Sequence, residues 1–258
     1  MLLVVDIGNT HTVIGVYQGE SLIAHWRLAS VKDRTEDEFG ILLTSLFSRK
    51  DLDASNVNHA VIGSVVPPLT GAWMRAVEDY FHTQPLLVGP GIKTGIRLKF
   101  DNPREIGADR IANAVGAHAQ YGGPIIVVDF GTATTFDFID AEGSYVGGLI
   151  APGIRVAADA LFERASKLPK IELEYPEHVL GRNTVESMQS GIMYGYACLV
   201  DGLIERLRKE TGAEARVIAT GGLAQTVARY AHHIEKVDEW VTLEGLRLIY
   251  LRNRSGSV

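Results

Sequence analysis

The stretch VVDIGNTHTVIGVY, residues 4–17, places an aspartate, Asp6, where an apolar strand ends, and then continues with glycine, asparagine and threonine before a second apolar strand begins. The same order returns in VVDFGTATTFDFID, residues 127–140, with Asp129 in the place of Asp6. An alignment this short can arise by chance, because glycine and threonine are common in turns. Two such stretches nearly half a chain apart still indicate an internal duplication, and therefore a chain of two similar halves.

Both turns have the composition of a phosphate-binding loop. Gly8 and Gly131 allow a close approach of the backbone. Successive backbone N–H groups and the hydroxyls of Thr10, Thr132 and Thr134 can then donate to phosphate oxygens. Because a carboxylate repels phosphate, the aspartate before each turn is expected to bind a cation, or water on a cation, that bridges to a nucleotide. The alternative is an Asx-turn in an ordinary β-hairpin, which explains each turn alone better than it explains the pair.

Composition excludes several classes of protein. The chain has 258 residues, 46% hydrophobic and 22% charged, which is typical of a globular protein with one large or two small domains. A formal net charge of −6 argues against nucleic-acid binding, which needs a basic face. The apolar N-terminus is interrupted by Asp6, and no apolar run is long enough to cross a membrane, so we expect a cytoplasmic protein. The histidines lack metal-ligand spacing, and the single cysteine, Cys198, is expected to be buried and unreactive.

The apolar pattern alternates between strands and helices, as in α/β proteins. Short apolar runs predict strands at residues 2–6, 12–17, 21–28, 59–64, 85–88, 125–129, 134–139, 144–151 and 216–219. Apolar residues at helical spacing predict helices at residues 36–50, 67–81, 155–165, 184–209, 226–230 and 244–250. Because no flexible linker separates the two halves, we expect them to pack closely.

One more helix is predicted in DNPREIGADRIANAVGAHAQY, residues 101–121. Asn102 is a natural N-cap, and Pro103 fits the first helical position. Glu105, three residues after the cap, completes a capping-box pattern. The helix is therefore expected to begin at this point.

Asp109 is the candidate for chemistry in this helix. Ile111, Val115 and Ala119 form an i, i+4 stripe for the core, and Asp109 lies roughly 200° around the helix from Ile111. It is expected to face away from the core, where it can accept the proton of an attacking hydroxyl. A helix N-terminus with Arg110 beside it also favours an anionic substrate. The alternative is that Asp109 and Arg110 are solvated surface residues.

The chain resembles type III pantothenate kinases, a family in the superfamily of acetate and sugar kinases, heat-shock chaperones and actin. The resemblance runs nearly end to end and rests on six segments in the family's order: DIGNTHT, DNPREIGADRIANA, DFGTATTFD, GGLIAPG, GRNTVESMQSGIMYG and ATGGLA. It implies an α/β fold of two duplicated ribonuclease-H-like (actin-like ATPase) domains with a central cleft. Residues 1–116 would form the domain with the first phosphate loop, and residues 117–258 the domain with the second phosphate loop and the adenosine loop.

The family's activity is implied in the same way. It is the ATP-dependent phosphorylation of pantothenate to 4′-phosphopantothenate, the first step of coenzyme A biosynthesis. The implied cofactors are Mg²⁺ and a monovalent cation, K⁺ or NH₄⁺. A homodimer is expected, with neither nucleic acid nor membrane as a partner.

The resemblance also assigns roles to single residues. Asp109 resembles the catalytic base that takes the proton from the hydroxyl of pantothenate, Asp129 the ligand of the monovalent cation, and Asp6 a magnesium-linked acid. The implied ATP contacts are Asp6, Ile7, Gly8, Asn9, Thr10, His11, Thr12, Val13, Thr132, Gly221 and Gly222. The implied substrate contacts are Phe100, Gly107, Ala108, Asp109, Arg110 and Thr184, the last supplied by the neighbouring protomer.

One position departs from the family pattern, and two other functions stay open. Phe100 stands where the family often has tyrosine, so its ring can pack on pantothenate without offering a phenolic donor. A kinase of the same superfamily acting on another hydroxyl would keep both turns but lose the segment EIGADR, which is present. An ATP-responsive switch protein would hydrolyse or bind ATP without a small acceptor. A shared fold alone does not decide between these functions.

Overall fold

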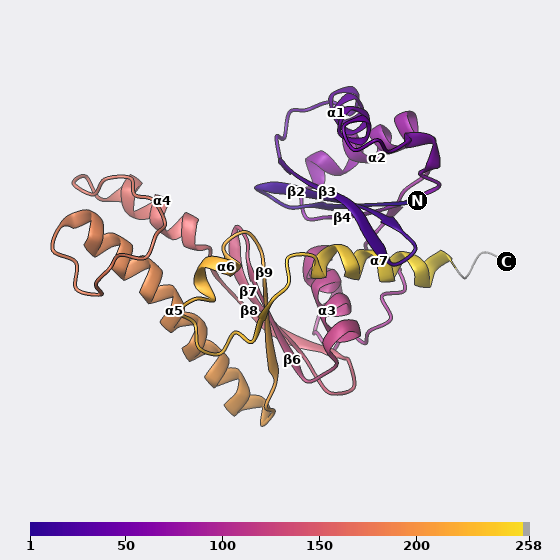
Figure 1. Ribbon diagram of the computed structural model, residues 1–258. Coiled ribbons are helices and arrows are strands. Elements are labelled where there is room, and N and C mark those ends of the chain that lie inside the picture. The colour runs from indigo at the N-terminus through magenta and orange to yellow at the C-terminus, as the bar shows by residue number, and fades with distance from the viewer. Residues whose placement is uncertain (255–258) are drawn as a thin grey trace. The chain divides into compact units, whose positions relative to one another are not determined.

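The computed structural model describes residues 1–254 (Figure 1). Its contacts divide the chain into two compact units. The first unit holds Met1–Gln120 together with the C-terminal segment from Trp240, and the second holds Tyr121–Glu239. The predicted division after residue 116 left the last helix in the second half, whereas by contacts this helix groups with the first unit.

Five strands form the sheet of the first unit. They are β1 (Leu2–Ile7), β2 (His11–Gln18), β3 (Ser21–Ala29), β4 (His59–Ser64) and β5 (Leu86–Leu87). Their order in the sheet is β3-β2-β1-β4-β5. The first three strands are antiparallel neighbours, whereas β4 runs parallel to β1 and β5 parallel to β4. The central strand is therefore β1, which ends at the first predicted phosphate turn.

Two helices, α1 (Glu36–Ser48) and α2 (Pro67–Phe81), cover one face of this sheet (Figure 1). Thr35 forms a complete capping box with Glu38 at the start of α1. Phe39 of α1 stacks on Trp73 of α2 with 4.4 Å between ring centroids, and both side chains are buried. The apolar side chains of alternate strand residues complete this core.

The last helix, α7 (Val241–Arg254), packs against β1 and β4 in the same unit. Leu243 and Leu246 lie directly over Gly15 and Gly63 of the sheet, at positions where a larger residue would meet them at about 3 Å. Gly15 and Gly63 alternate with the strand residues that face α1 and α2. The two opposite faces of the first sheet are thus both covered by helices.

The second unit repeats this architecture. Its strands are β6 (Ile125–Phe130), β7 (Ala133–Ile139), β8 (Tyr145–Pro152), β9 (Arg216–Thr220) and β10 (Lys236–Val237). The order is β8-β7-β6-β9-β10, again with three antiparallel strands followed by two parallel ones. Strand order and direction match the first sheet element by element, which confirms the predicted duplication.

Asp6 and Asp129 occupy the same place in the two sheets. Asp6 is the second-last residue of β1, and Asp129 is the second-last residue of β6. The turns that follow differ in length: residues 8–10 separate β1 from β2, and only residues 131–132 separate β6 from β7. The second turn is therefore one residue tighter than the first.

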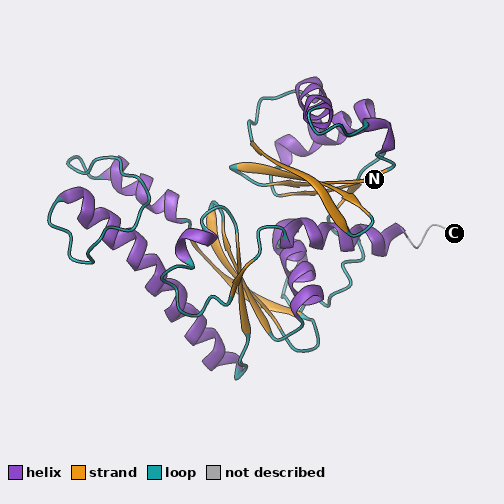
Figure 2. Cartoon of the chain, viewed as in Figure 1, coloured by secondary structure: helices purple, strands orange, loops and turns teal. Residues whose placement is uncertain are grey.

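Helices of the second unit bury their apolar sides against its sheet. They are α4 (Ile154–Arg164), α5 (Thr184–Thr211) and α6 (Ala224–Val227). Figure 2 shows that the segment joining α4 to α5 is loop throughout. Across residues 1–254, no helix has both the length and the apolar character that spanning a bilayer requires.

The helix predicted from Asn102 is different in the structure. Asn102 caps only the short 3₁₀ helix η2 (Pro103–Glu105), where its side chain accepts from the Arg104 N–H at 3.4 Å. Ile106 is then extended, with φ −76° and ψ 123°, so the α-helix cannot continue. The helix α3 (Ala108–Tyr121) begins two residues later, which puts Asp109 in its first turn.

Two smaller expectations also need correction, and two short elements were not predicted. Cys198 is exposed rather than buried. Ala119 is exposed, so the predicted core stripe of α3 ends before it. The short edge strand β10 was not predicted, because two residues give no periodic signal. The short 3₁₀ helix η1 (Ala54–Asn56) also lay outside the predicted elements. The remaining elements agree with the predicted ranges apart from shifts at their ends.

Candidate active site

The first phosphate turn is held by a set of short hydrogen bonds. The Gly8 N–H donates to the His11 carbonyl at 3.0 Å, and a Cβ on Gly8 would lie 2.9 Å from the same oxygen. Ser30, directly after β3, donates its hydroxyl to the Gly8 carbonyl at 2.6 Å. Asn9 and Thr10 are exposed at the tip, whereas the side chain of Thr12 is buried. The tip of the turn is thus accessible to a ligand, whereas the residues on either side of the tip are held in place by these hydrogen bonds.

The segment around Asp109 forms the start of α3. Asp109 accepts a hydrogen bond from the Arg110 N–H at 2.8 Å, and its Oδ1 lies so close to Gly107 that a Cβ there would overlap it. Burial raises the pKa of Asp109, although the Arg110 N–H and guanidinium act in the opposite direction. Ala108 is buried and Arg110 half-buried. Asp109 is therefore a sheltered carboxylate, not the solvated surface residue of the alternative.

Val65 connects the first phosphate turn to the Asp109 segment. Its N–H donates to the Ile7 carbonyl at 3.1 Å, at the end of β1. Its side chain lies 3.2 Å from the position of a Cβ on Gly107. Asp6 and the Asp109 segment therefore meet at the carboxyl ends of β1 and β4, the edge where ligands bind in open α/β sheets.

A second cluster lies at the equivalent edge of the second sheet. Gly221, with φ +92°, packs on the end of β6, where a Cβ would lie 2.5 Å from Asp129 Oδ1. Gly153 packs on the other side of the turn, where a Cβ would overlap the Thr132 carbonyl. The structure thus brings Asp129, Thr132 and Gly221 together, with the exposed Gly222 following. Thr134 is fully buried within β7, so it does not belong to the turn as expected.

The surroundings of Asp129 fit a bound cation. Its neighbours across the sheet are Thr135 on β7 and Thr220 on β9. The Thr135 hydroxyl is buried and has no hydrogen-bond partner among residues 1–254. A carboxylate beside such a hydroxyl offers two oxygen ligands, the type that K⁺ and other hard cations prefer.

Asp6 fits a different ion. It is a single half-buried carboxylate at a strand end, and Mg²⁺ is usually held by one or two carboxylates together with water and phosphate oxygens. Within residues 1–254 no group of three or more His, Cys, Asp and Glu side chains could enclose a metal. A metal at Asp6 would therefore take most of its ligands from nucleotide and water.

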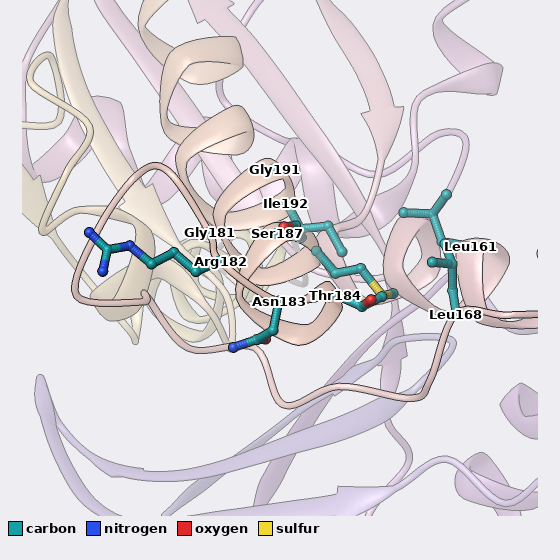
Figure 3. Close-up of a pocket in the computed structure, with 10 residues that line it drawn as sticks. Leu161, Leu168, Gly181, Arg182, Asn183, Thr184, Ser187, Gly191 and Ile192 are labelled. Atoms are coloured by element: carbon teal, nitrogen blue, oxygen red, sulfur yellow. The ribbon is translucent and has the colours of Figure 1, made fainter.

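Thr184 is the first residue of α5. It lines a cavity of about 690 Å³ in the second unit, together with Leu161, Leu168, Arg182, Asn183 and Met188 (Figure 3). Asn183 caps α5 by accepting from the Glu186 N–H at 2.9 Å. Thr184 is exposed. Phe100 is half-buried in the loop between β5 and η2.

Comparison with known proteins decides the family. Residues 2–206 match the sequence profile of type III pantothenate kinases. The chain belongs to this family. Type III pantothenate kinases of Myxococcus xanthus and Geobacter sulfurreducens are 51% and 52% identical to it, over 99% and 98% of this chain and the whole of each relative. This pantothenate kinase therefore phosphorylates pantothenate with ATP to give 4′-phosphopantothenate, the first step of coenzyme A biosynthesis.

Solved structures place the kinase in the actin-like ATPase fold. The activator of 2-hydroxyisocaproyl-CoA dehydratase from Clostridium difficile, with bound ADPNP, aligns at TM-score 0.58 and 16% identity, covering 99% of this chain and 96% of that one. A Baf family transcriptional activator from Campylobacter jejuni aligns at TM-score 0.60 and 20% identity, covering 98% and 99%. At these identities the likeness concerns the fold alone.

Sequence reasoning missed three residues of the site: Ser30, Val65 and Gly153. Each contacts the backbone of a predicted site residue. Gly153 ends the segment GGLIAPG but was assigned no role, whereas Ser30 and Val65 lie outside the six family segments. The duplication could have identified two of these residues, because Ser30 and Gly153 each follow the third strand of their unit. An alignment of the two halves by strand would have paired them.

Proposed function

We propose that this pantothenate kinase uses Asp109 as the base that accepts the proton of the attacking pantothenate hydroxyl. The supporting observation is the sheltered carboxylate at the start of α3, whose pKa is raised by burial. A proton acceptor works best when its pKa approaches the working pH, so the raised pKa suits the role. Because phosphoryl transfer is loose, the main contribution of Asp109 is the alignment of the hydroxyl with the γ-phosphate.

ATP is held by the two turns in this proposal. Within residues 6–13 the exposed tip donates backbone N–H groups to its phosphates, Thr132 contacts them from the second turn, and Gly221 and Gly222 leave room for adenosine. Asp6 anchors the water shell of Mg²⁺. When bound with ATP, Mg²⁺ offsets the charge of the β- and γ-phosphates. The exposed tip and fixed base of the first turn support this assignment.

The monovalent cation, K⁺ or NH₄⁺, is assigned to Asp129. The buried Thr135 hydroxyl, which has no hydrogen-bond partner in the described part of the chain, supports this choice, since such a group is costly unless a ligand satisfies it. The cation would offset part of the charge of the triphosphate. Activity that rises with K⁺ and loses this response in Asp129→Asn is the expected result.

Pantothenate binds at the start of α3 in this proposal. Its carboxylate is attracted by Arg110 and by the N–H groups of the first turn, including those of Ala108 and Gly107. Phe100 packs on the apolar part of the substrate. Thr184 is supplied by the second protomer of a homodimer. Because its co-substrate is ATP, we expect the enzyme in the cytoplasm.

Exposed apolar side chains near Thr184 support the dimer. Leu161, Phe162, Val179, Leu180 and Val185 are all exposed, and Leu180 reaches 82%. They belong to the cavity wall or to segments beside it. Apolar groups gathered in this way mark a surface that another protein covers.

One assay tests the mechanism. Transfer of labelled γ-phosphate from ATP to pantothenate is measured with Mg²⁺, with and without K⁺, for the native enzyme and for Asp109→Asn. We expect product formation to require pantothenate and to fall by at least about a hundredfold in the variant. Unchanged turnover in Asp109→Asn would refute the base assignment.

A further inference from the structure

Ser30 contacts the first phosphate turn in three places, although no family motif includes it. We propose that Ser30 is a positioning residue for ATP, which fixes the turn so that the Asn9 N–H is directed at a phosphate oxygen. This proposal rests on the proposed function of residues 6–13 as an ATP-binding turn. Ser30 itself does not touch the nucleotide.

The contacts of Ser30 determine the donor and the acceptor of each hydrogen bond at the turn. Its hydroxyl donates to the Gly8 carbonyl at 2.6 Å, and its N–H donates to the Thr10 carbonyl at 3.0 Å. The Thr12 hydroxyl lies 3.0 Å from Ser30 Oγ. Because a serine hydroxyl has a single hydrogen, which goes to Gly8, Thr12 must be the donor in this last bond. Thr12 is 1% exposed, so its hydroxyl serves the turn and is not offered to the ligand.

The geometry of the peptide bond carries the effect to the tip. The peptide between Gly8 and Asn9 is trans and planar, so its C=O and N–H point in opposite directions. Since the Gly8 carbonyl is directed at Ser30, the Asn9 N–H must point away from Ser30. Asn9 is exposed, and none of the described strands pairs with it. Ser30 thereby directs a backbone donor outward at the place where the turn is open.

The second unit shows that the fold itself does not need this serine. Ala29 pairs with His11, and Pro152 pairs with Ala133, so Gly153 occupies in the second sheet the place of Ser30 in the first. Gly153 has no hydroxyl and packs its backbone directly on the shorter second turn. The longer first turn leaves space for a side chain. The side chain of Ser30 occupies this space, and its hydroxyl forms two hydrogen bonds.

Calorimetric titration with MgATP in the absence of pantothenate tests the proposal. Ser30→Ala is compared with Ser30→Thr, which keeps the hydroxyl, and with Ser21→Ala, an exposed serine at the other end of β3. We expect Ser30→Ala to raise the Kd and the KM for ATP about tenfold, because the Gly8 carbonyl and the Thr12 hydroxyl lose their partner. The KM for pantothenate should stay unchanged. Ser30→Thr should recover most of the affinity, and Ser21→Ala should match the native enzyme.

The outcomes separate this proposal from the one on which it rests. A Kd of Ser30→Ala within twofold of the native value overturns the role of Ser30. An equal rise in the KM for pantothenate also overturns it, since the effect would then be general. If Asp6→Asn leaves MgATP binding unchanged, residues 6–13 are not the ATP turn and the proposed function fails instead. Should Ser30→Ala not fold, Ser30→Cys, with a similar volume and a weak donor, decides by the same Kd.

Discussion

The carboxylate of Asp109 lies directly against the Cα of Gly107, two residues before it, and accepts the N–H of Arg110 on its other side. A side chain at residue 107 would overlap Asp109 Oδ1 and also approach Val65, which is hydrogen-bonded to the end of β1. The absence of a side chain at residue 107 is therefore a condition for the position of the Asp109 carboxylate, the proposed base. Gly107 lies where the extended Ile106 separates η2 from α3, so this interruption of the helix bears directly on the proposed proton transfer.

Gly107→Ala should lower kcat while the protein stays folded. The added methyl group forces the Asp109 carboxylate to move, and a displacement of about 1 Å in a catalytic group can cost about a hundredfold in rate. Steady-state kinetics and thermal unfolding measure both quantities. Gly89→Ala is the matched control, because a Cβ there meets no atom within 4 Å. A native kcat in Gly107→Ala would contradict the positioning of Asp109 described above.

Asp109→Asn should abolish activity without loss of stability. Burial raises the pKa of Asp109 in the folded state, so the folded protein binds this proton more tightly than the unfolded chain. Stability is then lost as the pH rises from the ordinary aspartate range through the folded pKa. The amide has no charge to desolvate, and Asp109→Asn should unfold at the native temperature or above it at pH 7. Asp33→Asn, at an exposed site, serves as the comparison; a clearly lower midpoint for Asp109→Asn alone would argue against a buried charge.

The pH dependence of kcat/KM should report the same carboxylate. Because the base must be ionised, activity is expected to fall toward acid pH, with an apparent pKa above the usual 3.8 of aspartate. The charge of Arg110 lowers the pKa of Asp109, so Arg110→Gln should shift this limb to higher pH. An acid limb that does not move in Arg110→Gln would assign the titration to another group.

Gly221→Ala should weaken the response to K⁺. With φ +92°, alanine is strained at this position, and its Cβ would lie 2.5 Å from Asp129 Oδ1. Gly212→Ala is the control, because φ is +66° there but no atom lies within 4 Å. Both variants should lose about 1 kcal/mol of stability from the left-handed backbone. Gly221→Ala should lose more, because its Cβ would also lie 2.7 Å from backbone atoms of Phe130. Only Gly221→Ala should change the K⁺ concentration for half-maximal activity, and an identical K⁺ response in both would count against Asp129 as the ligand.

Mixed dimers test the role of Thr184 across the interface. Asp109→Asn and Thr184→Lys are each expected to be inactive as homodimers. In a mixed dimer one site combines an intact Asp109 with an intact Thr184 from the other protomer, so random pairing should restore about a quarter of the native activity. Co-expression with two affinity tags followed by activity measurement shows this. No recovery in purified mixed dimers would place both residues in one protomer.

Features that depend on local pattern could be predicted from the sequence. Apolar runs predicted the strands of both sheets, and the two Asp-x-Gly turns predicted their duplication, because strand ends and turn residues leave signals over a few positions. The local capping motif at Asn102 also led to a wrong predicted start of the helix. The motif was real but caps only η2, since the extended Ile106 interrupts the helix before α3.

Contacts between distant segments could not be predicted in this way. Ser30 and Val65 act on Gly8 and Ile7 through hydrogen bonds that join different strands or loops. Their residue types are common at strand ends, so no local pattern marks them. The placement of α7 in the first unit likewise follows from the fit of two leucines over Gly15 and Gly63.

That placement of α7 has a consequence for how the protein is made. A ribosome releases the strands of the first sheet early, but the helix that covers their second face emerges only after the whole second unit has been synthesised. Until α7 has been synthesised, one apolar face of the nascent first sheet is uncovered, and exposed strands in this state are prone to aggregate. Folding of the first unit is therefore completed only after the second unit has been synthesised, although most of the first unit lies earlier in the chain.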